Sequence, residues 1–218
     1  MKSEIFKRVI TSIIIFSILL IVLINSKYYL LTFLSLFYFL SSYEVYKNSN
    51  SLKFTLFSNI FLLIAFYAFY YLRGDTIEEL IFLCWVLFTT FLSDIGGYVF
   101  GKTFGGKKLT KISPNKTYSG AIGSFIFSLM SLPILFLFQK NFLNEMLINF
   151  FKFNYFTLTL LISFVAQIGD IFVSYWKRKF KIKDTGNIFP GHGGVLDRID
   201  GLIFVLIFLL ILKISVNI

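Results

Sequence analysis

Seven apolar stretches, each close to the length of a membrane-spanning helix, constrain this sequence more than any other feature. They run roughly over residues 9–24, 28–43, 54–72, 80–100, 120–138, 153–176 and 201–217. A helix needs about 20 predominantly apolar residues to cross a bilayer. Hydrophobic residues make up 57% of the chain and charged residues only 15%, whereas about 25% of a soluble domain is charged. The sequence therefore predicts an all-α, polytopic membrane helix bundle with about seven transmembrane helices, and it excludes a disordered chain.

The distribution of basic residues predicts the orientation of this bundle. With the N-terminus in the cytoplasm and seven spans, 16 of the 21 Lys and Arg residues fall on the cytoplasmic side. Because basic residues are enriched in cytoplasmic loops, we expect a cytoplasmic N-terminus and an external C-terminus. Segment 141–152 leaves an alternative open, since it could be an interfacial helix or an extension of the sixth span. An eighth crossing there would weaken the charge bias.

Composition also excludes some partners and sites. A net charge of +10 would suggest nucleic acid in a soluble protein. In a membrane protein the same charge indicates loops that face anionic lipid, so we expect no nucleic-acid partner. Cys84 is the only cysteine and His192 the only histidine. An internal disulfide and a metal site built from several histidines are therefore excluded within one chain.

Polar residues gather in the second part of the chain, which predicts two regions. Residues 1–92 are expected to form N-terminal transmembrane helices. Residues 93–218 are expected to form a catalytic membrane region with two cytoplasmic polar loops, 102–119 and 177–200. Neither loop is long enough for a soluble domain, so the chemistry is expected at the membrane surface.

The first polar region combines glycines with lysines. Glycines recur at positions 96, 97, 101, 105 and 106, with lysines between and after them. Glycine lets the backbone approach a ligand closely, and lysine supplies charge for phosphate. The region opens with Asp94 and closes with Ser113, Asn115, Lys116 and Thr117, just before a helix whose N-terminus favours anions. It indicates a phosphate site; the alternative is a basic loop that only contacts lipid headgroups.

The second polar region places carboxylates among cations. Four of the eleven acidic residues lie on this loop and its flanks: Asp170, Asp184, Asp197 and Asp200. Asp170 lies inside the sixth span, where an acidic residue is costly and indicates a functional site. Carboxylates hold Mg²⁺ while Lys and Arg hold phosphates, so this mixture is typical of a magnesium–nucleotide site. For Asp184 and Asp200 the alternative is an internally salt-bridged loop.

His192 stands in a glycine-rich turn, Gly191-His192-Gly193-Gly194. It could be a hydrogen-bonded turn residue, or it could donate a proton or contact phosphate. Phosphoryl and nucleotidyl transfer depend mainly on positioning and charge stabilisation. We therefore favour a positioning role for His192.

The second polar region resembles the C-terminal signature of the phosphatidate cytidylyltransferases, or CDP-diacylglycerol synthases. The matching run is Ser174-x-x-Lys177-Arg178-x4-Lys183-Asp184-x-Gly186-x3-Phe189-Pro190-Gly191-His192-Gly193-Gly194-x-Leu196-Asp197-Arg198-x-Asp200. The first region is similar to the family's upstream pattern, with Ser93-Asp94, Tyr98, Gly101, Phe104-Gly105, Ile112-Ser113-Pro114, Lys116-Thr117 and Gly120. The resemblance covers residues 93–201, and the first 90 residues match only as apolar spans.

This resemblance implies a reaction and a set of roles. The phosphate of phosphatidic acid would attack the α-phosphate of CTP, giving CDP-diacylglycerol and pyrophosphate. Asp170 and Asp197 would hold Mg²⁺, with room for a second cation such as K⁺. The catalytic set would be these two aspartates with Lys177, Arg178, Arg198 and His192. The substrate-binding set would be Asp94, Ser113, Asn115, Lys116, Thr117, Lys183, Asp184, Gly193, Gly194 and Asp200.

The resemblance also implies a location and partners. We expect an integral protein of a bacterial inner, or cytoplasmic, membrane with its active site facing the cytoplasm, where CTP is found. Its expected partners are CTP, phosphatidic acid and membrane lipid, and a homodimer is allowed.

The sequence departs from the family pattern at two places. It has Tyr118-Ser119 where the family usually has Trp-Glu, and Val173 where the family usually has Glu. The loss of two carboxylates could weaken a second cation site or shift substrate preference. Three alternatives stay open: an enzyme acting on another lipid phosphate, such as an isoprenoid one, a CTP-dependent lipid kinase, and a catalytically silent membrane protein. A transporter is disfavoured because the sequence shows no internal repeat.

Overall fold

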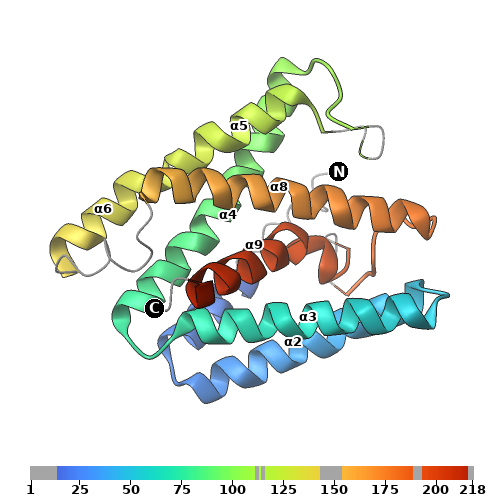
Figure 1. Ribbon diagram of the computed structural model, residues 1–218, viewed down its shortest axis with the longest axis horizontal. Helices are drawn as coiled ribbons and strands as arrows, with labels where there is room; N and C mark the ends of the chain where they lie inside the picture. Colours follow the sequence, from blue (N-terminus) through green and yellow to red (C-terminus); the bar gives the residue numbers. More distant parts are fainter. Residues whose placement is uncertain (1–13, 111–112, 114–115, 143–153, 189–192, 216–218) are drawn as a thin grey trace.

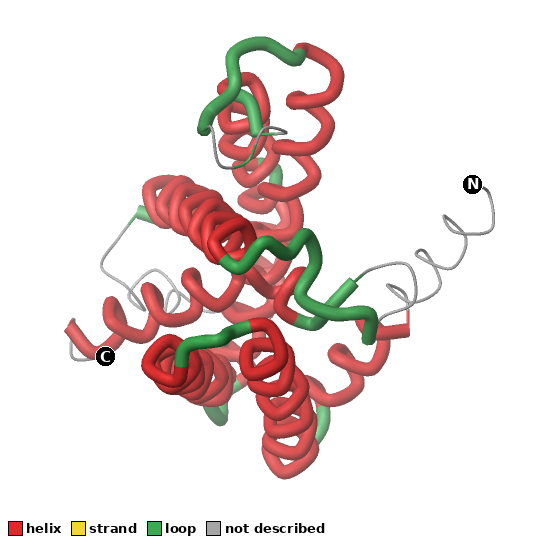
Figure 2. Tube along the Cα trace, turned by 90° about the vertical axis from the view of Figure 1, so that its right-hand side faces the viewer, coloured by secondary structure: helices red, strands yellow, loops and turns green. Residues whose placement is uncertain are grey.

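The computed structural model consists of helices and loops (Figure 2). It describes the chain except for residues 1–13, 111–112, 114–115, 143–153, 189–192 and 216–218. The described residues form no β-strand, and Lys108 and Thr117 form an isolated antiparallel bridge. The prediction of an all-α membrane helix bundle is therefore confirmed.

Within the described residues, each apolar stretch of the sequence corresponds to helical structure. The helices are α2 (Lys27–Asn48), α3 (Leu52–Arg73), α4 (Ile77–Phe104), α5 (Tyr118–Leu129), α6 (Ser131–Phe142), α8 (Tyr155–Lys179) and α9 (Leu196–Ser215). A shorter apolar helix, Ile14–Ile24, precedes them. Four described helical segments are long and apolar enough to cross a membrane: α3, α4, α8 and the α5–α6 segment Tyr118–Leu137. The exact number of spans stays a prediction, and most of segment 141–152 lies outside the described residues.

Side chains that accept backbone hydrogen bonds mark where several helices begin. Thr76 and Glu79 form a capping box at the start of α4, where each side chain accepts from the other's backbone N–H. Thr117 Oγ1 accepts from the N–H of Gly120 at 3.1 Å and begins α5. Since the first N–H groups of a helix have no partner within the helix, these caps fix where the polar loops end.

The helices are arranged so that the polar segments meet at one end of the bundle (Figure 1). Helices α2 and α3 lie side by side, α9 lies between α3 and α8, and α5 packs on α4. The α2–α3 turn, the loop between α4 and α5, and the segment between α8 and α9 all lie at the right-hand end in this view. The two polar loops therefore lie at the same end of the bundle.

The apolar core lies between α4, α8 and α9. Phe82, Leu158, Ile162 and Leu209 are all fully buried there. Trp85 adds a polar contact, because its Nε1 donates to Ser131 Oγ at 3.1 Å. This core joins the N-terminal halves of α4 and α8, so the polar side chains toward their C-terminal ends are carried on a rigid frame.

Glycines allow α4 and α5 to approach unusually closely. A Cβ on Gly96 would lie 2.3 Å from the carbonyl oxygen of Gly123, and a Cβ on Gly123 would lie 2.4 Å from Phe100 Cβ. Atoms of each helix thus occupy the space that a side chain at the facing glycine of the other helix would need. This approach carries α5 and the preceding Lys116-Thr117 toward the end of α4 that bears Asp94.

We expect Gly96→Ala to destabilise the protein by about 1–3 kcal/mol, since adding a side chain to a filled contact forces the backbones apart. Thermal unfolding in detergent measures this effect. Val99→Leu also adds a single carbon to α4, at an exposed position, and it should leave the transition nearly unchanged. Equal stability of Gly96→Ala and the native chain would contradict the close α4–α5 contact.

Candidate active site

A cavity of roughly 230 Å³ lies between α4, α5 and α8, beside the first polar loop. Its polar lining comes from four elements: Asp94 on α4, Lys116 and Thr117 before and at the start of α5, Ser124 on α5, and Gln167 and Asp170 on α8. Residues distant in the sequence therefore converge here, as expected for a binding site. The structure brings together Asp94, Lys116, Thr117 and Asp170 from the predicted set.

Asp170 is the most unusual carboxylate of this cavity. Its Oδ2 accepts a hydrogen bond from Lys116 Nζ at 3.0 Å, while its Oδ1 is buried without a hydrogen-bond partner among the described residues. Gly201 permits this position, because a Cβ there would lie 2.8 Å from Oδ1. A buried acceptor without a donor is costly. The unpartnered oxygen is therefore available to a cation.

Asp94 and Asp200 add two further carboxylates close to Asp170. Asp94 interacts electrostatically with Asp170 and Lys116, and Asp200 interacts with Asp170, Lys177 and Asp94. Like charges so close together repel one another, which favours a bound cation. Even so, in the part of the chain that the structure describes, no group of three or more Asp, Glu, His or Cys side chains is arranged to enclose a metal ion.

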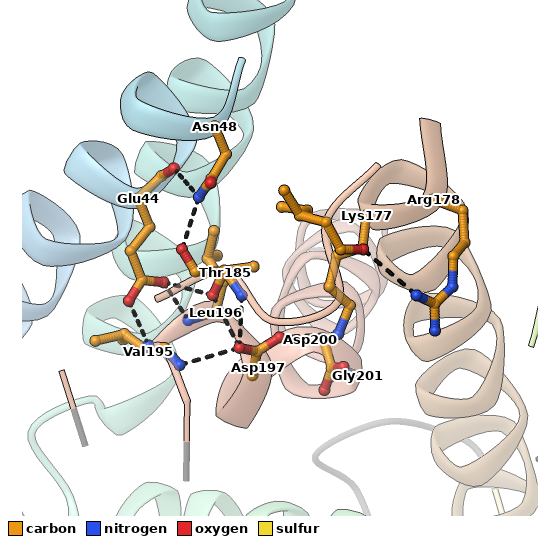
Figure 3. A network of polar contacts seen from close by, with 12 residues as sticks. Glu44, Asn48, Lys177, Arg178, Thr185, Val195, Leu196, Asp197, Asp200 and Gly201 are labelled. Carbon is orange, nitrogen blue, oxygen red and sulfur yellow. Dashed lines mark hydrogen bonds and ion pairs between the residues drawn. The ribbon is translucent and has the colours of Figure 1, made fainter. Parts of the chain in front are cut away.

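Asp197 is held by donors from its own loop (Figure 3). Its Oδ1 accepts from Lys177 Nζ at 2.8 Å, and its Oδ2 accepts from Thr185 N at 2.8 Å, Gly194 N at 3.0 Å and Thr185 Oγ1 at 3.1 Å. Asp197 lies in the first turn of α9, ahead of the predicted span 201–217. Burial alone would raise its pKa, but the Lys177 ammonium and the backbone N–H groups outweigh burial and hold the pKa of Asp197 below its usual value.

Glu44 of α2 belongs to the same network, although it was not among the predicted site residues (Figure 3). This carboxylate is 2% exposed. It accepts from Val195 N at 2.8 Å, from Leu196 N at 3.0 Å and from Thr185 Oγ1 at 2.8 Å. Glu44 therefore caps the start of α9 from another helix. The one available signal was a single acid at the end of an apolar span.

Glycines of the second loop serve this network. Gly193 has φ +86°, and a Cβ there would lie 2.9 Å from Asp197 Oδ2. A Cβ on Gly194 would lie 2.5 Å from Glu44 Oε1. Both glycines, predicted to contact substrate, are thus also needed for the loop to close on its carboxylates.

The remaining predicted residues fall into three groups. Arg178, Lys183, Asp184 and Arg198 are exposed at the loop end of the bundle, and Arg178 Nη1 lies 3.4 Å from the carbonyl oxygen of Ile182. Ser113 is part of a tight turn in which its carbonyl accepts from Lys116 N at 3.0 Å. Asn115 and His192 lie outside the described residues, so their roles stay predictions.

The two departures from the family pattern have different surroundings. Val173 is 6% exposed and packs in an apolar cluster with Trp176, Leu196 and Ile203. Ser119 Oγ donates to the carbonyl oxygen of Gly105 and lies 2.9 Å from Thr117 Oγ1. Ser119 therefore ties the loop to the start of α5, while Val173 contributes only apolar contact.

Comparison with known proteins gives one consistent family. A model described as the cytidylyltransferase family matches residues 46–215. The chain is 41% identical over 164 residues to the phosphatidate cytidylyltransferase of Staphylococcus haemolyticus, covering 74% of this chain and 59% of that protein. It is 44% identical over 115 residues to that of Rickettsia conorii, covering 52% of this chain and 50% of that protein. The chain thus spans between half and three fifths of the length of these curated relatives.

We expect Glu44→Gln to lower the free energy of unfolding by about 1–3 kcal/mol, because an amide nitrogen would replace an oxygen that faces a buried donor. Thermal unfolding in detergent measures the loss. Glu78→Gln makes the same change at a half-exposed position of α4 and should stay within about 0.5 kcal/mol of the native chain. If both variants unfold like the native protein, Glu44 does not stabilise the start of α9.

Proposed function

This chain belongs to the cytidylyltransferase family, and from that membership we propose that it is a CTP:phosphatidate cytidylyltransferase of phospholipid synthesis. It would make CDP-diacylglycerol and pyrophosphate from CTP and phosphatidic acid. The observation that carries the proposal concerns Asp170, which lines a cavity with Lys116 and pairs with it through Oδ2, while its Oδ1 is buried without a hydrogen-bond partner among the described residues. A carboxylate poised for a cation beside a lysine suits the transfer of a nucleotide between phosphates.

The reaction needs charge stabilisation more than acid–base chemistry. An oxygen of the lipid phosphate would form a bond to the α-phosphorus of CTP, and the bond from that phosphorus to the β-phosphate oxygen would break. The nucleophile is already an anion, and pyrophosphate leaves with the electron pair, so no activating base is required. The main obstacle is repulsion between two anions, which Lys116 and Lys177 would reduce.

A divalent cation would suit carboxylate oxygen donors, although the described carboxylates would have to draw closer together to enclose it. Mg²⁺ prefers carboxylate oxygens, and it would stabilise the charge that develops on the phosphates. Asp170 would hold it through the unpartnered Oδ1. Asp197 would contribute Oδ1, which now accepts from Lys177. Asp94 and Asp200 supply further carboxylates for a second cation such as K⁺.

We place the site at the cytoplasmic face of a bacterial inner membrane. Both polar loops lie at the same end of the bundle as the α2–α3 turn (Figure 1), which is flanked by Lys47 and Lys53. An end this rich in basic residues suits the cytoplasmic side. CTP would then arrive from the cytosol, while the lipid phosphate lies at the membrane surface.

Pyrophosphate release by the purified full chain in detergent tests the proposal. CTP, Mg²⁺ and phosphatidic acid should together give release, and omission of any one should abolish it. Release only with an isoprenoid phosphate would assign another lipid substrate, and phosphorylation of a lipid by CTP would assign a kinase. Absence of both reactions with every lipid would support the catalytically silent alternative, which rests on Val173 and Ser119.

We expect Asp170→Asn and Asp197→Asn each to lower turnover by about 100-fold or more, since each removes a carboxylate that would hold the cation beside the transferred phosphate. Asp75→Asn is the matched control, because the Asp75 side chain is 85% exposed and pairs with Lys27 at 2.6 Å. All three variants should insert into membranes at native levels. Near-native turnover in either test variant would refute its assignment.

A further inference from the structure

A second cavity, of roughly 290 Å³, opens between α3, α8 and α9, and we call it the apolar groove. Its walls include Phe54, Phe61 and Leu62 of α3, Trp176 of α8 and Phe204 of α9, and Ser58 is the only lining residue with a hydroxyl. Phe57 and Phe172 also line it, with 61% and 48% of their surfaces exposed. The groove is therefore accessible from the outer surface of helices that are expected to face lipid.

One end of the apolar groove adjoins the charged network of Figure 3. Val45, Trp176 and Leu196 line the groove, and their immediate neighbours in the chain are Glu44, Lys177 and Asp197. Lys177 and Asp197 themselves pair at 2.8 Å. The segment that follows the groove carries five basic residues: Lys177, Arg178, Lys179, Lys181 and Lys183. A hydrocarbon-lined groove thus ends at a strongly basic segment.

Trp176, which lines the groove, also carries a polar atom without a hydrogen-bond partner among the described residues. Trp176 is 6% exposed, and its Nε1 is buried with no hydrogen-bond partner among the described residues. A buried donor normally has an acceptor. The ester carbonyl where an acyl chain joins glycerol is such an acceptor, whereas a simple isoprenoid phosphate has no carbonyl and accepts only through its phosphate group.

We propose that the apolar groove seats one acyl chain of phosphatidic acid, with the ester carbonyl toward Trp176 Nε1 and the phosphate toward Lys177. This inference rests on the proposed function and adds the recognition of the lipid tail. The basic residues next to the groove favour a lipid with an anionic headgroup, and the phosphomonoester of phosphatidic acid is anionic. Burial of an acyl chain among aromatic side chains is favourable in proportion to the apolar area covered.

The first test fills the groove. Leu62→Phe adds bulk inside it, and Leu63→Phe makes the same change on a residue that is 56% exposed on the surface of α3. For Leu62→Phe, kcat/KM should fall about tenfold with dioleoyl phosphatidic acid and stay near native with the dihexanoyl form. Leu63→Phe should leave both values near native. Equal losses with the two lipids would overturn the proposal.

A second variant that fills the groove keeps the test decisive if Leu62→Phe misfolds. Ser58→Leu adds bulk at the half-buried hydroxyl of the groove and should show the same preference for the short-chain lipid. If Leu62→Phe does not fold, this variant decides the outcome. Native selectivity for chain length in Ser58→Leu would overturn the proposal.

The second test detects occupancy without turnover. The chain has two tryptophans, so Trp85→Phe leaves Trp176 as the sole tryptophan, which can be excited selectively over the tyrosines. Phosphatidic acid brominated on its acyl chains should quench Trp176 saturably and more strongly than brominated phosphatidylcholine at the same mole fraction. Equal quenching by the two lipids would show that the groove takes any lipid and would contradict the proposal. If Trp85→Phe does not fold, Trp176→Phe should instead abolish the saturable quenching seen in the native chain.

The two tests separate failure of this inference from failure of the proposed function. A native chain that releases no pyrophosphate with any phosphatidic acid would contradict the function, while selective quenching would still support the groove. A native chain that is active, but whose groove variants keep native selectivity for chain length, would contradict the groove alone.

Discussion

The capture of backbone donors by two carboxylates is the interaction on which the rest of the site depends. Glu44 and Asp197 together accept from the N–H groups of Thr185, Gly194, Val195 and Leu196. Without these contacts the start of α9 and the loop before it would hold several unpaired donors in a buried environment, each costly. The loop therefore keeps a fixed shape although it has little regular secondary structure.

This arrangement links the N-terminal helices to the predicted catalytic region. Glu44 comes from α2, so the first part of the chain supplies more than apolar spans. Asn48, one turn later, donates to the carbonyl oxygen of Thr185 at 2.6 Å. With Thr185 held from both sides, Asp197 and Lys177 keep a fixed geometry near Asp200, and Asp200 in turn lies near Asp170. A chain of charges thus connects the α2 side of the bundle to the cavity between α4, α5 and α8.

The sequence predicted the fold class and much of the cavity for identifiable reasons. Long apolar runs admit few alternatives to membrane helices, and an acid within such a run, such as Asp170, is rarely without a function. Lys116 was predicted from its place before a helix, and the structure adds its pairing with Asp170. The role of Glu44 could not be predicted, because its partners lie 141 to 152 residues away. Contacts between such distant segments depend on how the helices pack, and periodicity within one segment does not encode them.

The packing of α8 also shows which cavity is affected by Val173, the valine that replaces the family's usual glutamate. Asp170 and Val173 are three residues apart, yet Asp170 lines the cavity between α4, α5 and α8 while Val173 lines the apolar groove between α3, α8 and α9. A glutamate at 173 would place a carboxylate beside Trp176, Leu196 and Ile203, where an unpaired charge is expensive. Valine instead extends the hydrocarbon wall. The carboxylate that the family usually carries is therefore absent from the apolar groove, and the cavity that holds Asp170, Asp94 and Lys116 keeps its charges.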